Sequence, residues 1–300
     1  MTNLVKFSIT LSLVFLIDNI YADREAFEST YVPLAPEKIV IQNASIYDGD
    51  GGEFFETDVL VEDGKIIAIG KDLPFTKEFK VIDASGKWVT PGIIDIHSHM
   101  GVYPAPGVRT SSDGNEATSP VTADVWAEHS IWVQDPQYAL ALTGGVTAFH
   151  ILPGSANLIG GRGVTVKNLQ RNTINSMKFP EAPHSLKMAC GENPKRVYGN
   201  RGQAPSTRMG NAAGYRKSWI QAEGYLRRLN EYEEKSDEAK ELEYAPTRDL
   251  EMETLVGVLK GEILVHNHCY RADEMATMID IAKEFNYKIT AFHHGVEAYK

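Results

Sequence analysis

The stretch TPGIIDIHSH, residues 90–99, is the part of the sequence from which the fold is predicted here. A Pro-Gly turn leads into a short apolar run, which is typical of a buried strand, and two histidines follow at its end. Residues i and i+2 of a strand project to the same face, with Cα atoms about 6–7 Å apart. The side chains of His97 and His99 can therefore converge on one metal ion, although this spacing alone is a weak signal.

Upstream of this stretch, short apolar runs alternate with turn residues. Strands are predicted at 38–42, 57–61, 65–69 and 80–83, with turns at 48–52 and 62–65. We expect these elements to form a small β module over residues 37–88.

Downstream, candidate strands alternate with candidate helices. The strands are predicted at 92–97, 146–152, 186–190, 263–266 and 288–292, and the helices at 137–142 (the end of one), 212–235 and 273–285. This alternation predicts an α/β fold with a parallel sheet, and polar residues at strand ends favour a (β/α) barrel over residues 89–300. An eight-stranded barrel needs about 250 residues. We therefore expect an incomplete barrel, which stops after about strand 6 of a longer protein.

The N-terminus predicts export. An apolar run at residues 7–17 follows Lys6 and precedes the small residue Ala22, which is the layout of a secretory signal peptide over residues 1–22. The run is shorter than the roughly 20 residues of a transmembrane helix, and a buried N-terminal helix is the alternative. Removal of the signal would leave a linker at 23–36 and a periplasmic or secreted protein without a membrane span.

The net charge and the two cysteines say less about function than the motifs do. The formal net charge of -10 at pH 7 argues against a nucleic-acid partner, because phosphate binding needs a cationic face. The oligomeric state stays open, a homo-oligomer included. An exported protein could pair its two cysteines, Cys190 and Cys269, but we expect them to be small buried thiols beside the site.

Several motifs in one order resemble the metal-dependent amidohydrolase superfamily, in particular its branch of imidazolonepropionases and prolidase-like enzymes. They are VEDGKIIAIG at 61–70, KWVTPGIIDIHSH at 87–99, TGGVTA at 143–148, LKMACGENPK at 186–195, ILVHNH at 263–268 and FHHGVEAYK at 292–300. The resemblance implies a (β/α)8 barrel of the TIM type, and it implies that residues 37–88 are part of a small β-sandwich module.

The same resemblance implies a site for Zn²⁺ or another divalent metal, with one or two ions. The implied histidine ligands are His97, His99, His266 and His294. Lys187 lies where many relatives carry a lysine that is carbamylated to bridge two metals, and Glu192 is a rival for that role. The family also uses an aspartate of the eighth strand to move the proton. We expect that general base beyond Lys300, and we expect the 300-residue chain alone to be inactive or nearly so.

The implied reaction is hydrolysis of C–N bonds in small-molecule amides, such as cyclic amides or proline-containing dipeptides, by a metal-activated water. Two alternatives stay open. One is a non-catalytic binding module on a degenerate barrel, and the other is a metal-dependent deaminase that uses the same ligands with a different pocket.

Other polar residues lead to separate predictions. Strand alternation predicts that His268 and His293 point away from the barrel axis as supporting or packing residues. No metal-ligand pattern includes His129, His150 or His184. The glycine-rich segment 157–163 is expected to form an active-site loop rather than a phosphate-binding loop. Arg208 is either a clamp for a substrate carboxylate or a surface arginine.

Overall fold

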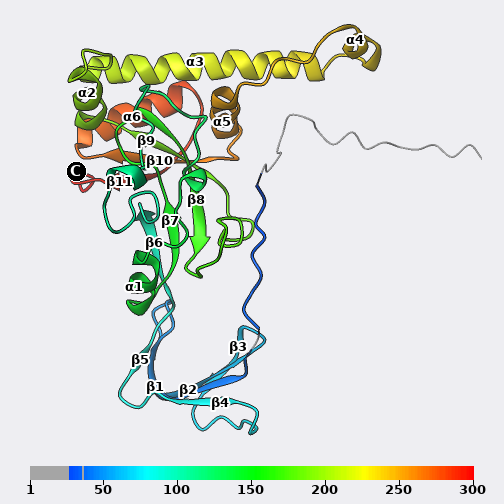
Figure 1. Ribbon diagram of the computed structural model, residues 1–300, viewed down its shortest axis with the longest axis vertical. Coiled ribbons are helices and arrows are strands. Elements are labelled where there is room, and N and C mark those ends of the chain that lie inside the picture. Colours follow the sequence, from blue (N-terminus) through cyan, green and yellow to red (C-terminus); the bar gives the residue numbers. More distant parts are fainter. Residues whose placement is uncertain (1–26, 36) are drawn as a thin grey trace, which may run out of the picture.

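The computed structural model describes residues 27–35 and 37–300. The predicted signal peptide, residues 1–22, lies outside the described residues. Two sheets organise the described chain: a small one at one end of the long axis, and a larger one that helices cover toward the other end (Figure 1).

The small sheet confirms the strands predicted before residue 90. Its five strands are β1 (Ile39–Tyr47), β2 (Glu53–Glu62), β3 (Lys65–Gly70), β4 (Lys80–Asp83) and β5 (Trp88–Val89). They are arranged in the order β3-β2-β1-β4, and β5 pairs with β1. Asp48 closes the β1–β2 turn, because its carboxylate accepts hydrogen bonds from the backbone amides of Asp50 and Gly52, each at 2.8 Å.

The larger sheet has six strands in the order β11-β10-β9-β8-β7-β6. They are β6 (Ile93–Ser98), β7 (Val146–Ile151), β8 (Ile159–Lys167), β9 (Ser185–Ala189), β10 (Leu264–Cys269) and β11 (Ile289–His294). Strands that follow each other in the chain are neighbours in the sheet, as in a barrel, and the sheet has two open edges at β6 and β11. This mixed α/β architecture confirms the predicted incomplete barrel.

Strand β8 was not predicted. The segment 157–163, predicted as an active-site loop, instead leads into this strand, which runs antiparallel to both β7 and β9. The glycines permit the close approach: a Cβ atom on Gly161 would lie 2.3 Å from the carbonyl oxygen of Val125. At Gly163 it would lie 2.5 Å from the Oγ atom of Ser185. A glycine-rich run is here a strand between crowded neighbours, and the sheet is not wholly parallel.

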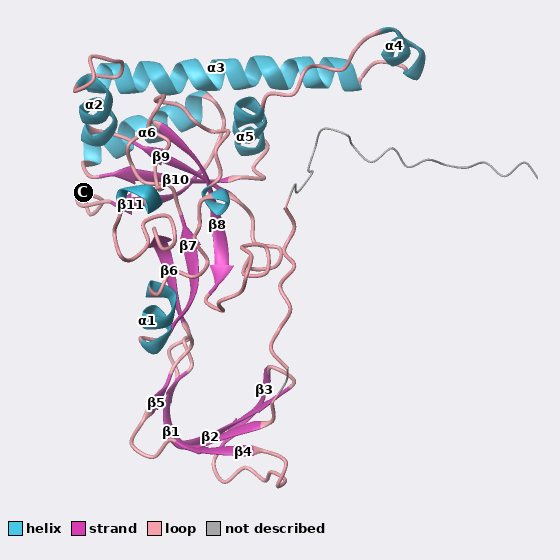
Figure 2. Ribbon diagram, viewed as in Figure 1, coloured by secondary structure: helices cyan, strands magenta, loops and turns pink. Residues whose placement is uncertain are grey.

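Six helices of the described residues accompany the sheets. They are α1 (Gln137–Thr143), α2 (Glu192–Gly199), α3 (Arg208–Glu233), α4 (Asp237–Leu242), α5 (Leu250–Leu259) and α6 (Ala272–Glu284), with short 3-10 turns at Arg109–Ser111 and Ala127–His129. Figure 2 shows the long helix α3 lying across the end of the molecule opposite the small sheet. Among the described residues, no helix has the length and apolar character needed to cross a membrane.

Helix α3 helps to form the largest hydrophobic core. Its buried residues include Tyr215 and Trp219, and they lie in one cluster with residues of β9, β10, α5 and α6. The indole ring of Trp219 is 4.4 Å from the ring of Tyr287, centroid to centroid. This core fixes the helices behind the strands whose ends carry the candidate ligands.

Part of the predicted linker contacts the larger unit. The backbone amide of Thr30 donates to the carbonyl of Asn175 at 2.9 Å. The hydroxyl of Ser29 donates to the carbonyl of Lys178, also at 2.9 Å. Ser29 and Thr30 therefore lie against the connection between β8 and β9 and not along the small sheet.

Thr207 gives a first test of the fold. Its hydroxyl caps α3 by accepting a hydrogen bond from the amide of Gly210 at 3.0 Å. We expect Thr207→Ala to lower the free energy of unfolding by about 1 kcal/mol, because it leaves a helix-end amide without a partner. Urea unfolding measures the change. Thr207→Ser keeps the cap and should differ little from the parent, so an equal loss in both variants would contradict this role.

Candidate metal centre

The candidate ligands lie at the carboxyl ends of three parallel strands. His97 lies near the end of β6 with His99 just beyond it, β10 carries His266, and β11 ends at His294. Lys187 lies in β9 and is in register with His266 on the neighbouring strand. Strands far apart in the sequence therefore bring four of the predicted histidines and the lysine to one end of the sheet.

The distances between imidazole rings define the cluster. The ring of His97 is 5.1 Å from that of His99 and 5.0 Å from that of His294, centroid to centroid. The ring of His266 lies against that of His150 at 4.5 Å. His266 therefore lies beside a histidine in the interior of the sheet, whereas the other three predicted histidines approach one another.

The predicted orientations of His268 and His293 were wrong. His268 is two residues from His266, so strand geometry places both on the same face. Its ring lies 4.3 Å from that of His294. His293 lies 4.5 Å from the ring of His97, and its Nε2 atom is 2.8 Å from Nδ1 of His266. Both side chains belong to the cluster.

Lys187 is fully buried, with no exposed surface. Its ammonium group donates a hydrogen bond to the carbonyl of Pro153 at 2.8 Å. Burial lowers the pKa of Lys187 to about 7. A buried lysine with one carbonyl partner is costly for a fold to keep, which is typical of a functional residue.

The histidines of the cluster are neutral at pH 7. Burial, and after it the charge of Lys187, lowers the pKa of His97 to about 2. The same two causes lower the pKa of His266 to about 4. For His268, burial and then His294 lower the pKa to about 3. Neutral imidazole is the form that binds metals.

The donor set fits a divalent metal in its chemistry. The Nδ1 atom of His97 is buried and has no hydrogen-bond partner. His99 donates from Nδ1 to the carbonyl of Leu152 at 2.8 Å, which leaves the lone pair on its Nε2 atom. As they stand, no three His, Cys, Asp or Glu side chains of the described residues form a group that could hold a metal ion. The histidines are a loose cluster of neutral donors.

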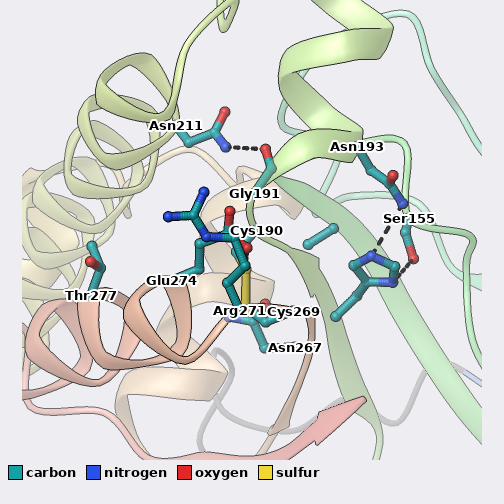
Figure 3. The surroundings of a disulfide bond; sticks show 12 residues. Ser155, Cys190, Gly191, Asn193, Asn211, Asn267, Cys269, Arg271, Glu274 and Thr277 are labelled. Atoms are coloured by element: carbon teal, nitrogen blue, oxygen red, sulfur yellow. Dashed lines mark hydrogen bonds between the residues drawn. A yellow bond between two sulfur atoms is a disulfide. The ribbon is translucent and has the colours of Figure 1, made fainter. Parts of the chain in front are cut away.

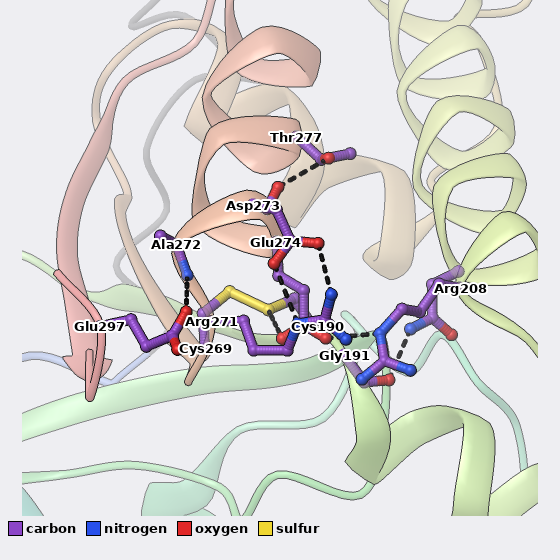
Figure 4. A network of polar contacts seen from close by, with 11 residues as sticks. Cys190, Gly191, Arg208, Cys269, Arg271, Ala272, Asp273, Glu274, Thr277 and Glu297 are labelled. Carbon is purple, nitrogen blue, oxygen red and sulfur yellow. Dashed lines mark hydrogen bonds and ion pairs between the residues drawn. A yellow bond between two sulfur atoms is a disulfide. The ribbon is translucent and has the colours of Figure 1, made fainter. Parts of the chain in front are cut away.

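Two predicted site residues lie elsewhere. Glu192 is exposed and opens helix α2, where an acidic residue favours the helix N-terminus. Arg208 forms an ion pair with the buried carboxylate of Glu274, at 2.5 Å between Nε and Oε1. Figure 4 shows the two side chains, which come from α3 and α6. Neither residue joins the histidine cluster, and the alternative of a structural surface arginine fits Arg208 better.

The two cysteines form a disulfide, so the prediction of buried thiols was right about burial and wrong about the chemistry. Cys190 and Cys269 are joined across the ends of β9 and β10 (Figure 3). Their backbones are tied to the cluster: the amide of Cys190 donates to the carbonyl of His268 at 2.8 Å. The disulfide therefore fixes two strands that carry candidate ligands.

Sequence reasoning missed the role of His150. This residue is buried in β7, where Nδ1 lies 3.0 Å from the hydroxyl of Thr165 and Nε2 lies 2.8 Å from the hydroxyl of Ser185. Both ring nitrogens are used, so His150 supports His266 rather than offering a free donor. No signal in the sequence indicates this, because the three residues meet only through the pairing of β7, β8 and β9.

The chain is similar to several known amidohydrolases. The chain is 36% identical over 269 residues to amidohydrolase tasK of Hapsidospora irregularis, a match that covers 84% of this chain and 27% of that protein. It is 38% identical to the crystal structure of an amidohydrolase from Thermotoga maritima MSB8, with a TM-score of 0.79 over 87% of this chain and 66% of that one. A dihydroorotase of Lactobacillus acidophilus is 42% identical over 85 residues, which is 27% of this chain and 18% of the dihydroorotase.

The chain thus spans about a quarter of the length of the first of these relatives and just under two thirds of the solved structure. No model of a protein family matches it. The matches to both amidohydrolases extend over most of this chain. The chain belongs to the amidohydrolase superfamily.

Proposed function

We propose that the protein is an exported, metal-dependent hydrolase of C–N bonds in small-molecule amides or dipeptides. The observation that carries the proposal is the cluster of neutral histidines at the ends of β6, β10 and β11, beside the buried Lys187. An arrangement of this kind supplies several nitrogen donors without a competing positive charge on the rings.

Within this cluster we assign the metal to His97 and His99, together with His294. From β10 we assign His268 in place of the predicted His266, because the ring of His268 lies 4.3 Å from that of His294, whereas the ring of His266 lies against that of His150. A bound divalent metal would lower the pKa of a water molecule and polarise the carbonyl under attack. The imidazoles would hold the ion, and their burial would keep bulk water from competing for it.

Lys187, and not Glu192, is the residue that we propose to be carbamylated. In that step the neutral amine of Lys187 attacks CO₂, an N–C bond forms, and one proton is released, which leaves an anionic carbamate. Lys187 is in register with His266 on the neighbouring strand β10, whereas Glu192 is exposed at the start of α2. A carbamate would also turn a buried positive charge into a negative one that a metal can balance.

Export is proposed from the N-terminal residues and gains support from the disulfide. A buried disulfide persists in a periplasm or outside the cell, and it is rare in the reducing cytosol.

Elemental analysis tests the metal proposal directly. We expect the purified protein to contain zinc, iron or manganese at near-stoichiometric levels and to lose it on dialysis against a chelator. A protein that holds none of these metals, and takes up none of them when they are added, would contradict the proposal and favour a non-catalytic module.

A further inference from the structure

We propose that the four-residue segment Leu152–Ser155, which follows β7, is the element that positions three of the candidate ligands, and that Ser155 holds the Nδ1 proton of His268 in the tautomer that Asn193 selects. The inference rests on the proposed metal site, which it deepens by assigning residues that act on the ligands and do not touch the metal. Of the residues in the segment, Leu152 and Pro153 make their contacts through backbone carbonyls and only Ser155 uses its side chain. A substitution of Ser155 can therefore test the inference.

Each contact of the segment reaches a different strand. The carbonyl of Leu152 accepts a hydrogen bond from Nδ1 of His99 at 2.8 Å. The carbonyl of Pro153 accepts one from Lys187 at 2.8 Å. The hydroxyl of Ser155 lies 2.9 Å from Nδ1 of His268. One short segment therefore binds groups that come from β6, β9 and β10.

The geometry around His268 fixes its tautomer. The side-chain amide nitrogen of Asn193 lies 3.1 Å from Nε2 of His268, and an amide nitrogen only donates. The lone pair is then on Nε2, and the proton is on Nδ1, from which it is donated to Ser155. Figure 3 shows Ser155 and Asn193 each joined by a dashed line to a different nitrogen of the same imidazole ring. His99 has the same arrangement, with its proton held by a carbonyl and its Nε2 lone pair left for a metal.

The segment is itself held rigidly. The amide of Leu152 donates to the carbonyl of Ser98 at 3.0 Å, and the amide of Gly154 donates to that of Gly114 at 2.7 Å. A Cβ atom on Gly154 would lie 2.1 Å from the side-chain nitrogen of Asn115, so a larger residue would displace the segment. A rigid outer partner reduces the freedom that a ligand loses when it binds a metal.

Two variants, one at each nitrogen of the His268 ring, have different expected effects on zinc affinity. Ser155→Ala removes the acceptor for Nδ1 and should weaken zinc binding by about 10-fold or more, within the range of about 10–100-fold for outer partners of ligands. Asn193→Ala removes a donor to the lone pair that zinc would use, so it should not weaken binding. Ser155→Thr keeps the hydroxyl and should restore the parent affinity.

Zinc affinity is measured by competition with a chromophoric chelator, and thermal unfolding checks that each variant is folded. If Ser155→Ala does not fold, Gly154→Ala tests the same segment and should also weaken zinc binding. Equal zinc affinity in the parent and in folded Ser155→Ala would overturn the inference.

The ¹⁵N chemical shifts of the His268 ring give a second readout that does not need metal. We expect the Nδ1–H tautomer in the parent, and a changed Nδ1 chemical shift in Ser155→Ala because the Nδ1 proton loses its acceptor. A parent protein that binds no zinc, together with this change of chemical shift in Ser155→Ala, would refute the proposed function and leave the role of Ser155 intact. A parent that binds zinc with His268 in the other tautomer would refute the inference alone.

Discussion

Replacing His97 with alanine is expected to weaken zinc binding by more than about 100-fold. The loss of a residue that only hydrogen-bonds to a metal ligand already lowers metal affinity by about 10–100-fold, and His97 is a proposed ligand itself. His97 lies at the centre of the cluster, within 4.5–5.1 Å of the rings of His99, His293 and His294. Its Nδ1 atom is buried without a partner, so the substitution breaks no side-chain hydrogen bond there. The fold should therefore survive while the metal is lost.

The matched control for this variant is His129→Ala. The His129 side chain is 51% exposed and contacts Trp126 and Phe27, outside the cluster. Zinc titration of both variants, with circular dichroism to follow unfolding, separates loss of a ligand from loss of fold. Retention of parent zinc affinity in His97→Ala, or an equal loss in His129→Ala, would contradict the assignment.

The pair at His97 and His99 could be predicted from sequence because its information is local. A turn, an apolar strand and a spacing of two residues follow each other directly, and a strand has a fixed period of two. The same rule, applied to His268, places it on the face of His266 and would have identified it as a candidate ligand. The sequence therefore contained the information needed to place His268, and the prediction applied the alternation of the strand incorrectly.

Other features depend on contacts that no local pattern describes. The segment 157–163 has the composition of a loop, and it leads into strand β8 because its glycines let the backbone pass close to Val125 and Ser185. The support of His150 by Thr165 and Ser185 requires three strands to be in register. The positioning segment at 152–155 works mainly through backbone carbonyls, which carry no residue-type signal at all.

The pairing of the cysteines likewise could not be predicted, because Cys190 and Cys269 are 79 residues apart in sequence. They meet only when β9 and β10 become neighbours in the sheet. The backbone bonds around them show what the pairing fixes: Cys190 binds the carbonyl of His268, and the amide of Gly295 donates to the carbonyl of Cys269 at 2.9 Å. The disulfide thus joins the ends of β9 and β10, and a backbone hydrogen bond attaches the end of β11 to Cys269.

Removing this disulfide with Cys190→Ala and Cys269→Ala together is expected to lower the free energy of unfolding by about 2–4 kcal/mol. Cross-linking two residues so far apart restricts the unfolded chain, and longer closed loops give larger effects. Both sites are buried in the main core, so small apolar replacements should leave the folded packing largely intact. Urea unfolding under oxidising conditions measures the loss.

A reductant separates the disulfide from the side chains themselves. Treatment of the parent with tris(2-carboxyethyl)phosphine should lower its stability toward that of the double variant, whereas the double variant should not respond. An unchanged unfolding midpoint in the parent would show that the cysteines are not paired in solution. A response of equal size in both proteins would mean that the reductant acts elsewhere. If instead only the parent responds, and its zinc affinity falls with its stability, the same bond that ties β9 to β10 also holds the histidines of the site in place.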